Sequence, residues 1–214
     1  MKKKHVLLIC SPNLGLIDSW LPIVHELKKT NKYMFDIFFP KYTSLIQLEK
    51  KNVLSNLSFE LFGSVIFLDI FNSYKKTTFS EKLVDQMKLK TFLSYIRNSI
   101  LKIIKRDAFF GDKFFYNLNY IYYLIFNKKN IIKIEPQDLS NYDLIFYDIY
   151  EEGGEYFKPI KEILFKNLKF SMSHGSDFPT LKKVPKLKTK NVNVIKFTNS
   201  ELEDKYYNDN FELD

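Results

Sequence analysis

The sequence predicts an α/β fold, in which helices cover both faces of an open parallel sheet. Short apolar runs alternate along the 214 residues with amphipathic segments, the pattern of strands connected by helices. The first run, residues 5–10, is almost wholly apolar, which is typical of a strand buried on both faces. Because no internal repeat or Ser/Gly linker divides the chain, we expect a single domain over residues 1–214.

The first run begins a strand, loop, helix, strand unit. Residues 20–29 carry apolar side chains at helical spacing, Asp18 or Ser19 is suited to cap this helix, and Pro22 fits a first turn. Residues 35–39 form the next short apolar run. Two strands joined by a helix in one sheet are expected to be parallel, with a right-handed crossover.

The middle of the chain predicts one further strand and two helices. The strand covers residues 65–70. Thr78 and Glu81 have the spacing of a capping box, and apolar positions at helical spacing then continue to Arg106. The aromatic-rich residues 114–126 are expected to form the second helix, with its apolar side on the sheet.

The last third of the chain again alternates strands and helices. We expect strands at residues 143–150, 169–173 and 192–198, a helix at residues 156–166, and a short polar helix at residues 200–207.

Charge and composition narrow the classes of partner. The chain carries 33 lysines and arginines against 25 acidic residues, a net charge of +8, but only Arg97 and Arg106 are arginines. Base and phosphate recognition relies on the planar fork of arginine, so we do not expect a nucleic-acid-binding protein. Five lysines in residues 180–190 are instead suited to a phosphate-bearing or membrane-associated substrate.

The apolar stretches and the cysteine content favour a cytoplasmic protein. Stretches such as residues 120–126 are far shorter than the roughly 20 residues of a membrane-spanning helix. The N-terminal apolar stretch is too short for a secretory signal. Cys10 is the single cysteine, which excludes an internal disulfide, and its place in a strand predicts a core position.

Three glycine-bearing segments each follow a predicted strand: residues 11–19, 150–155 and 174–177. Ligands bind at the carboxyl ends of parallel strands, where helix N-termini direct free N–H groups and partial positive charge. Each segment also holds an ionisable residue. The sequence therefore predicts that the three segments meet at one edge of the sheet and form a site.

His174 and Asp18 are the candidate catalytic residues. An imidazole at a strand end, beside Gly175, can accept a proton near neutral pH, and the alternative is a histidine bonded within a structural loop. Asp18 orients this histidine or acts as the base in its place, and the alternative is that it only caps a helix. Asp177 is suited to orient the imidazole or to cap a following turn. The residues expected to bind substrate are Asn13, Gly15, Gly154, Glu155, Gly175, Ser176 and Asp177.

Several well-known motifs are missing from the sequence. It has no dinucleotide fingerprint, no phosphate-binding P-loop and no nucleophile elbow around a serine. His5 and His25 are far from His174 along the chain and do not form a metal-binding pattern with it. We expect neither a cofactor nor a metal.

The arrangement of these motifs resembles the N-terminal half of a GT-B glycosyltransferase. The features that match are the loop with Gly15 and Asp18 before a helix that contains Pro22, the His-Gly-Ser-Asp run at residues 174–177, and a last strand that leads into Ser-Glu at residues 200–201. The resemblance is to bacterial surface-polysaccharide transferases and CDP-glycerol glycerophosphotransferases.

The resemblance implies a two-domain enzyme in cell-surface polysaccharide synthesis. Its first, Rossmann-like domain binds a sugar or polyol-phosphate acceptor, with Gly15 and Asp18 in the acceptor loop and His174-Gly175 as the family's His-Gly pair. Its second domain binds the nucleotide donor and takes roughly another 150 residues, the size of a typical domain. We expect that domain to be absent from this chain, either because the gene product is truncated or split, or because a second chain supplies the domain. The place of action is the cytoplasm or the inner face of the cell membrane.

Two other functions remain open at this point. One is a non-catalytic α/β module that binds a partner or a phosphorylated ligand through the basic, aromatic residues 113–133. The other is one half of an enzyme similar to UDP-sugar 2-epimerases, which share the two-domain layout.

Overall fold

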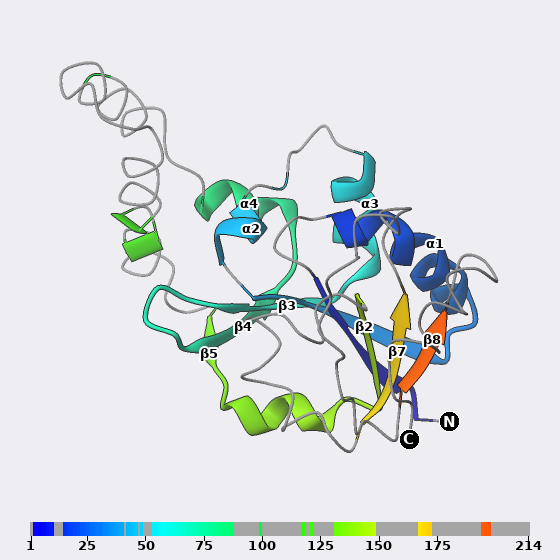
Figure 1. Cartoon of the computed structure of the whole chain (residues 1–214). Helices are drawn as coiled ribbons and strands as arrows, with labels where there is room; N and C mark the ends of the chain where they lie inside the picture. The colour runs from blue at the N-terminus through cyan, green and yellow to red at the C-terminus, as the bar shows by residue number, and fades with distance from the viewer. Residues whose placement is uncertain are drawn as a thin grey trace, which may run out of the picture.

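The computed structural model describes residues 2–10, 15–40, 42–46, 48, 53–87, 99, 117–118, 120–121, 131–148, 167–172 and 194–197. Within these residues the fold is α/β, a single sheet with helices packed against it (Figure 1). In this described part of the chain, no helix combines the length and the apolar character needed to cross a membrane.

The described residues form one sheet of eight strands in the order β5-β4-β3-β2-β1-β6-β7-β8. The strands are β1 Lys4–Ile9, β2 Tyr33–Phe39, β3 Ser64–Leu68, β4 Tyr74–Thr78, β5 Ile132–Lys133, β6 Leu144–Asp148, β7 Leu168–Met172 and β8 Val194–Phe197. The six strands from β3 across to β8 are parallel. Each of these six overlaps a strand that the sequence predicts.

The expectation of a wholly parallel sheet is wrong at one edge. β4 pairs antiparallel with β3, and β5 pairs antiparallel with β4, so the sheet is mixed. A short turn between β3 and β4 makes this possible, because antiparallel neighbours need no helical crossover. Asn72 lies in that turn with φ 55°, a left-handed conformation that asparagine tolerates better than most residues.

The described helices are α1 Gly15–Lys29, α2 Tyr42–Ile46, α3 Val53–Leu61, α4 Glu81–Met87 and the 3₁₀-helix η2 Pro136–Asn141. Side chains of all four α-helices join one hydrophobic cluster on one face of the sheet, whereas Leu139 of η2 belongs to the cluster on the other face. Figure 1 shows the same division, with η2 alone below the sheet. The expected helices on both faces are thus present only in part, because the described α-helices share one face.

Helix α1 begins earlier than its apolar pattern predicts. Gly15 is its first residue, so Asp18 and Ser19 lie inside the helix and neither caps it. Pro22 lies in the interior and not in the first turn. Because proline has no N–H, Pro22 cannot donate to the carbonyl of Asp18 one turn earlier.

Helix α4 is capped by a residue other than the predicted one. Thr78 is the last residue of β4, and the hydroxyl of Ser80 accepts a hydrogen bond from the N–H of Leu83 at 3.3 Å. The predicted Thr78/Glu81 capping box is therefore wrong. The predicted continuation to Arg106, apart from Ser99, and the predicted helices at residues 156–166 and 200–207 lie outside the described residues.

Residues 117, 118, 120 and 121 are helical, which agrees with the helix expected over residues 114–126. Tyr120 is buried against the sheet, with its ring edge-on to Phe67 of β3 at 6.2 Å between centroids.

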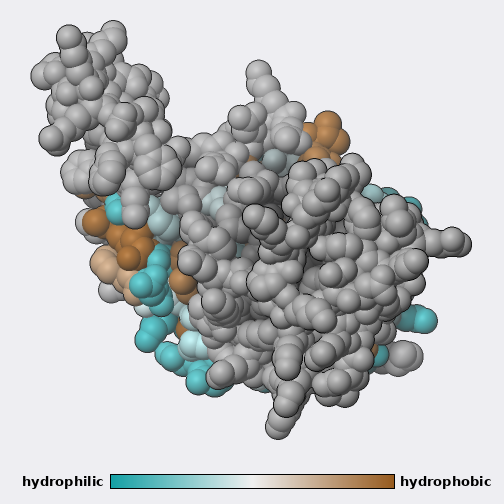
Figure 2. Space-filling model, viewed as in Figure 1, coloured by the Kyte–Doolittle hydropathy of each residue, from teal (hydrophilic) through white to brown (hydrophobic). Residues whose placement is uncertain are grey.

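The larger hydrophobic cluster lies between the sheet and the α-helices. At its centre the ring of Trp20 stacks on Phe146 of β6 at 4.5 Å, and Phe170 of β7 meets Phe146 edge-on at 5.5 Å. Phe146 thus joins α1 to two neighbouring strands. On the face shown in Figure 2, described hydrophobic residues appear in one area at the left and another at the upper right.

Replacing Phe146 by alanine removes this link and leaves a cavity, so we expect the free energy of unfolding to fall by about 3–5 kcal/mol. Met34→Ala is the matched control, because Met34 lies in the same sheet but is half exposed, and it should change stability by no more than about 0.5 kcal/mol. Urea unfolding followed by circular dichroism measures both variants. Equal losses in the two would contradict the packing described here.

Candidate functional site

The carboxyl ends of three neighbouring strands, β1, β6 and β7, lie together at one end of the sheet. We call this end, where the parallel strands finish, the carboxyl edge. β1 pairs with β6, where Leu8 is opposite Phe146, and β6 pairs with β7, where Asp148 is opposite Met172. Because the three strands are parallel, the chain leaves all of them at the same edge. The segments that follow β1, β6 and β7 are the three glycine-bearing segments singled out in the sequence.

Gly15 is placed at this edge by the start of α1. It is the first residue of the helix and comes six residues after the end of β1. The first N–H groups of a helix have no partner within it, so the N-terminus of α1 offers donors and partial positive charge at this edge. Asp18 is the fourth residue of α1 and lies in that first turn.

The other predicted site residues lie outside the described part of the chain: Asn13, Gly154, Glu155, His174, Gly175, Ser176 and Asp177. Their roles stay predictions. The described strands β1, β6 and β7 show only that the segments holding these residues leave the sheet at the same end.

The structure confirms the core position predicted for Cys10 and places His25 at the surface. Cys10 is fully buried in the larger hydrophobic cluster. His25 is exposed on α1, with its Nδ1 3.2 Å from Glu26. Among the described residues, no group of three or more His, Cys, Asp or Glu side chains could hold a metal ion.

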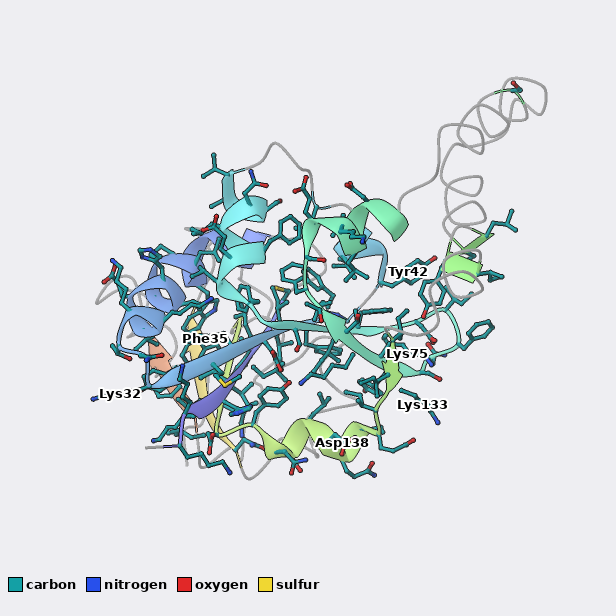
Figure 3. The ribbon with its side chains drawn as sticks, turned by 180° about the vertical axis from the view of Figure 1, so that it is seen from behind. Lys32, Phe35, Tyr42, Lys75, Lys133 and Asp138 are labelled. Atoms are coloured by element: carbon teal, nitrogen blue, oxygen red, sulfur yellow. The ribbon has the colours of Figure 1, made fainter. Side chains whose placement is uncertain are left out.

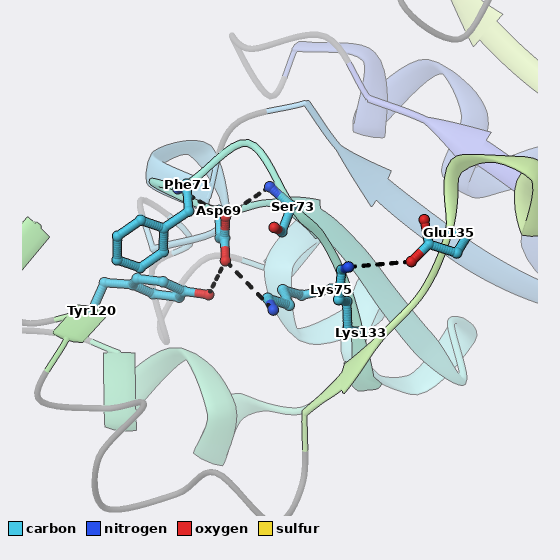
Figure 4. A network of polar contacts seen from close by, with 7 residues as sticks. All are labelled: Asp69, Phe71, Ser73, Lys75, Tyr120, Lys133 and Glu135. Carbon is cyan, nitrogen blue, oxygen red and sulfur yellow. Dashed lines mark hydrogen bonds and ion pairs between the residues drawn. The ribbon is translucent and has the colours of Figure 1, made fainter.

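A buried carboxylate, Asp69, organises the turn between β3 and β4 (Figure 4). Its Oδ1 accepts the backbone N–H groups of Phe71 and Ser73, each at 2.8 Å. Its Oδ2 accepts the hydroxyl of Tyr120 at 3.3 Å and lies 3.7 Å from the ammonium of Lys75. These bonds occupy both carboxylate oxygens, so we assign Asp69 a structural role.

A second polar cluster joins β2, β4 and the residue that follows η2. The ammonium of Lys76 donates to Asp36 at 2.7 Å and to the hydroxyl of Tyr142 at 3.2 Å. The same hydroxyl donates to Asp36 at 2.6 Å, while the other oxygen of Asp36 accepts the backbone N–H of Ser64. We call Asp36, Lys76 and Tyr142 the polar triad.

The surroundings of Tyr142 favour its neutral form. Burial, followed by the hydrogen bond and the negative charge of Asp36, raises the pKa of Tyr142 well above its usual range. The phenol therefore stays protonated and serves as a hydrogen-bond donor to Asp36.

Sequence reasoning missed both polar clusters. Asp36 is separated from Lys76 by 40 residues and from Tyr142 by 106. The sequence held one signal for the polar triad, the single aspartate Asp36 inside the otherwise apolar run of β2. A carboxylate that faces the interior requires a partner.

Comparison of the chain with models of protein families, with curated proteins and with solved structures finds no match.

Asp69→Ala should lower the free energy of unfolding by about 2–4 kcal/mol, because two backbone donors lose their acceptor and Lys75 loses its counter-charge. Asp69→Asn keeps an oxygen in place of Oδ1 and should lose less. Urea unfolding measures both. An alanine variant as stable as the wild type would contradict the role of Asp69 in the turn.

The raised pKa of Tyr142 has a consequence at alkaline pH. Above about pH 10 the unfolded chain releases the phenolic proton that the folded protein still holds, so stability falls as pH rises, by at most about 1.4 kcal/mol per pH unit for this group. Tyr142→Phe should show a shallower fall over the same range, in urea unfolding between about pH 8 and pH 11. Parallel curves for the two proteins would contradict the assignment.

Proposed function

We propose that this chain is the acceptor-binding half of a GT-B type glycosyltransferase or glycerophosphotransferase in cell-surface polysaccharide synthesis. The observation that carries the proposal is the reversal of strand order at β1. From β1 the chain adds β2 and β3 on one side, and then β6, β7 and β8 on the other.

A reversal of this kind creates a crevice at the carboxyl edge, because the connections on its two sides run in opposite directions. The order β3-β2-β1-β6-β7-β8 corresponds to the 3-2-1-4-5-6 order of Rossmann-like sheets, which bind their ligands in that crevice. Gly15 and the N-terminus of α1 lie on the β1 side of it. This position supports binding of an acceptor that carries a phosphate.

The proposed chemistry assigns a role to each predicted residue. His174 accepts the proton of the acceptor hydroxyl as that oxygen bonds to the donor, while the bond from the donor to its nucleotide leaving group breaks. Asp18 orients His174 or acts as the base in its place. Gly15, Gly154 and Gly175 let the ligand approach the backbone, and Asn13, Glu155, Ser176 and Asp177 supply hydrogen bonds.

The donor-binding part is proposed to come from a second chain. Helix N-termini and basic side chains can neutralise a leaving phosphate, so the proposal requires no metal. The acceptor is a sugar or a polyol phosphate, and the excess of lysine suits a place at the inner face of the membrane.

The test is turnover of UDP-glucose and CDP-glycerol by the purified chain, alone and with the product of the neighbouring gene. We expect turnover that His174→Ala lowers by about 100-fold or more, because general-base catalysis is worth about that much. His25→Ala is the matched control, since His25 is exposed on α1, and it should leave the rate unchanged.

Near-normal turnover in His174→Ala would overturn the assignment of the base. Tight binding of the second chain without turnover under any condition would favour the non-catalytic module instead. Turnover that interconverts UDP-sugars without an acceptor would favour the epimerase.

A further inference from the structure

A second pocket lies on the face of the sheet opposite the α-helices. It has a volume of about 270 Å³, and isoleucines of β3 and of the segment between β5 and η2 form its apolar part. The polar lining comes from β1, β4 and η2 with the residue after it: His5, Lys76, Asp138, Asn141 and Tyr142. Figure 3 shows Asp138 on η2, below the strands.

This pocket is separate from the carboxyl edge of the sheet, where the proposed function places the catalytic residues. His5 is the second residue of β1, and its backbone bonds to Asp143, which immediately precedes β6. Both residues lie at the amino ends of their strands, whereas the glycine-bearing segments follow the carboxyl ends. The pocket and the carboxyl edge are therefore at opposite ends of β1.

Lys76 lines the pocket and provides a hydrogen-bond donor. Its ammonium has three donors, and among the described residues two are used, by Asp36 and by Tyr142. The Lys76 side chain is 34% exposed, so a third donor is accessible to a ligand. Asp36 and Tyr142, the other two members of the polar triad, hold the ammonium in place.

The η2 side of the pocket supplies acceptors. One carboxylate oxygen of Asp138 accepts the backbone N–H of Glu135 at 2.9 Å, and the carboxylate keeps further acceptor capacity. Asn141 has an amide that both donates and accepts, and His5 has an imidazole that does the same when neutral. Hydrogen-bond donors and acceptors thus line the pocket on the side of the sheet and on the side of η2.

The charges disfavour an anionic ligand. Asp36 already neutralises Lys76 at 2.7 Å, and Asp138 adds a negative charge to the lining. A metal is not favoured either, because within the described residues no group of three ligating side chains exists. An organic cation would meet the ammonium of Lys76, so a neutral ligand whose groups both donate and accept fits the lining best.

We propose that this pocket binds a small neutral polyhydroxylated molecule, a monosaccharide or a short polyol, between the polar triad on the sheet and η2. Hydroxyl groups donate to Asp138 and accept from Lys76, and the C–H face of such a molecule packs on the isoleucines. A volume of about 270 Å³ is at the small end of ligand pockets, which fits a single sugar ring.

The experiment is nuclear magnetic resonance titration of the full isotope-labelled chain with glucose, inositol and glycerol, and separately with inorganic phosphate and glycine. We expect saturable shifts in His5, Asn141 and Tyr142 with at least one hydroxylated probe, at dissociation constants of about 1–10 mM, as is usual for small polar ligands. Asn141→Ala should weaken that binding about fivefold, the effect of one lost hydrogen bond.

Gln137→Ala is the matched control, because Gln137 is exposed on the same short helix and does not line the pocket. It should bind as the wild type does. Thermal melting checks that both variants are folded, and if Asn141→Ala is not, Asp138→Asn takes its place.

The proposal is overturned if no hydroxylated probe shifts the pocket residues, if phosphate or glycine binds there more tightly, or if the lining variants bind normally. It does not depend on the proposed transferase function. Titration of the His174→Ala protein separates the two, since that substitution should leave binding in this pocket intact.

Discussion

The parallel pairing of β1 with strands on both sides is the constraint on which the rest of this structure depends. β1 is bonded to β2 through its whole length and to β6 through residues 6–8, and residues 6–9 are buried. A strand so enclosed must carry apolar side chains toward both faces. It also separates the two halves of the sheet, and so fixes where the order of strands reverses and where the segments after β1, β6 and β7 leave it.

The sequence was sufficient to predict the six parallel strands, because their apolar runs are strong local signals. It failed for β4, whose Tyr-Lys-Lys-Thr-Thr sequence has no apolar run and gains its strand conformation by pairing with β3. The start of α1 was misjudged because residues 15–19 carry little helical periodicity, and Asp18 and Ser19 are good caps in isolation. The true cap of α4, Ser80, lies two residues beyond the threonine that the capping-box spacing favoured.

The candidate sites differ in how far they could be predicted. The glycine-bearing segments could be singled out because glycines after strands are visible in the sequence, and the strand pairing adds that the three segments leave the sheet at one end. The polar triad could not be predicted, since it joins residues 40 to 106 positions apart through a fold that only the whole chain defines. The pocket beside it follows from that triad and from the position of η2. We thus propose different ligands for the two ends of β1.

The meeting of the three glycine-bearing segments at the carboxyl ends of β1, β6 and β7 is tested most directly by a crystal structure of the full chain that shows residues 11–15, 150–155 and 173–177. Neighbouring strands are about 4.8 Å apart, so the Cα atoms of Gly15, Gly154 and His174 should lie within about 15 Å of one another around an open crevice. An imidazole enclosed in the hydrophobic interior, or a Gly154 segment folded back to the amino edge, would contradict it.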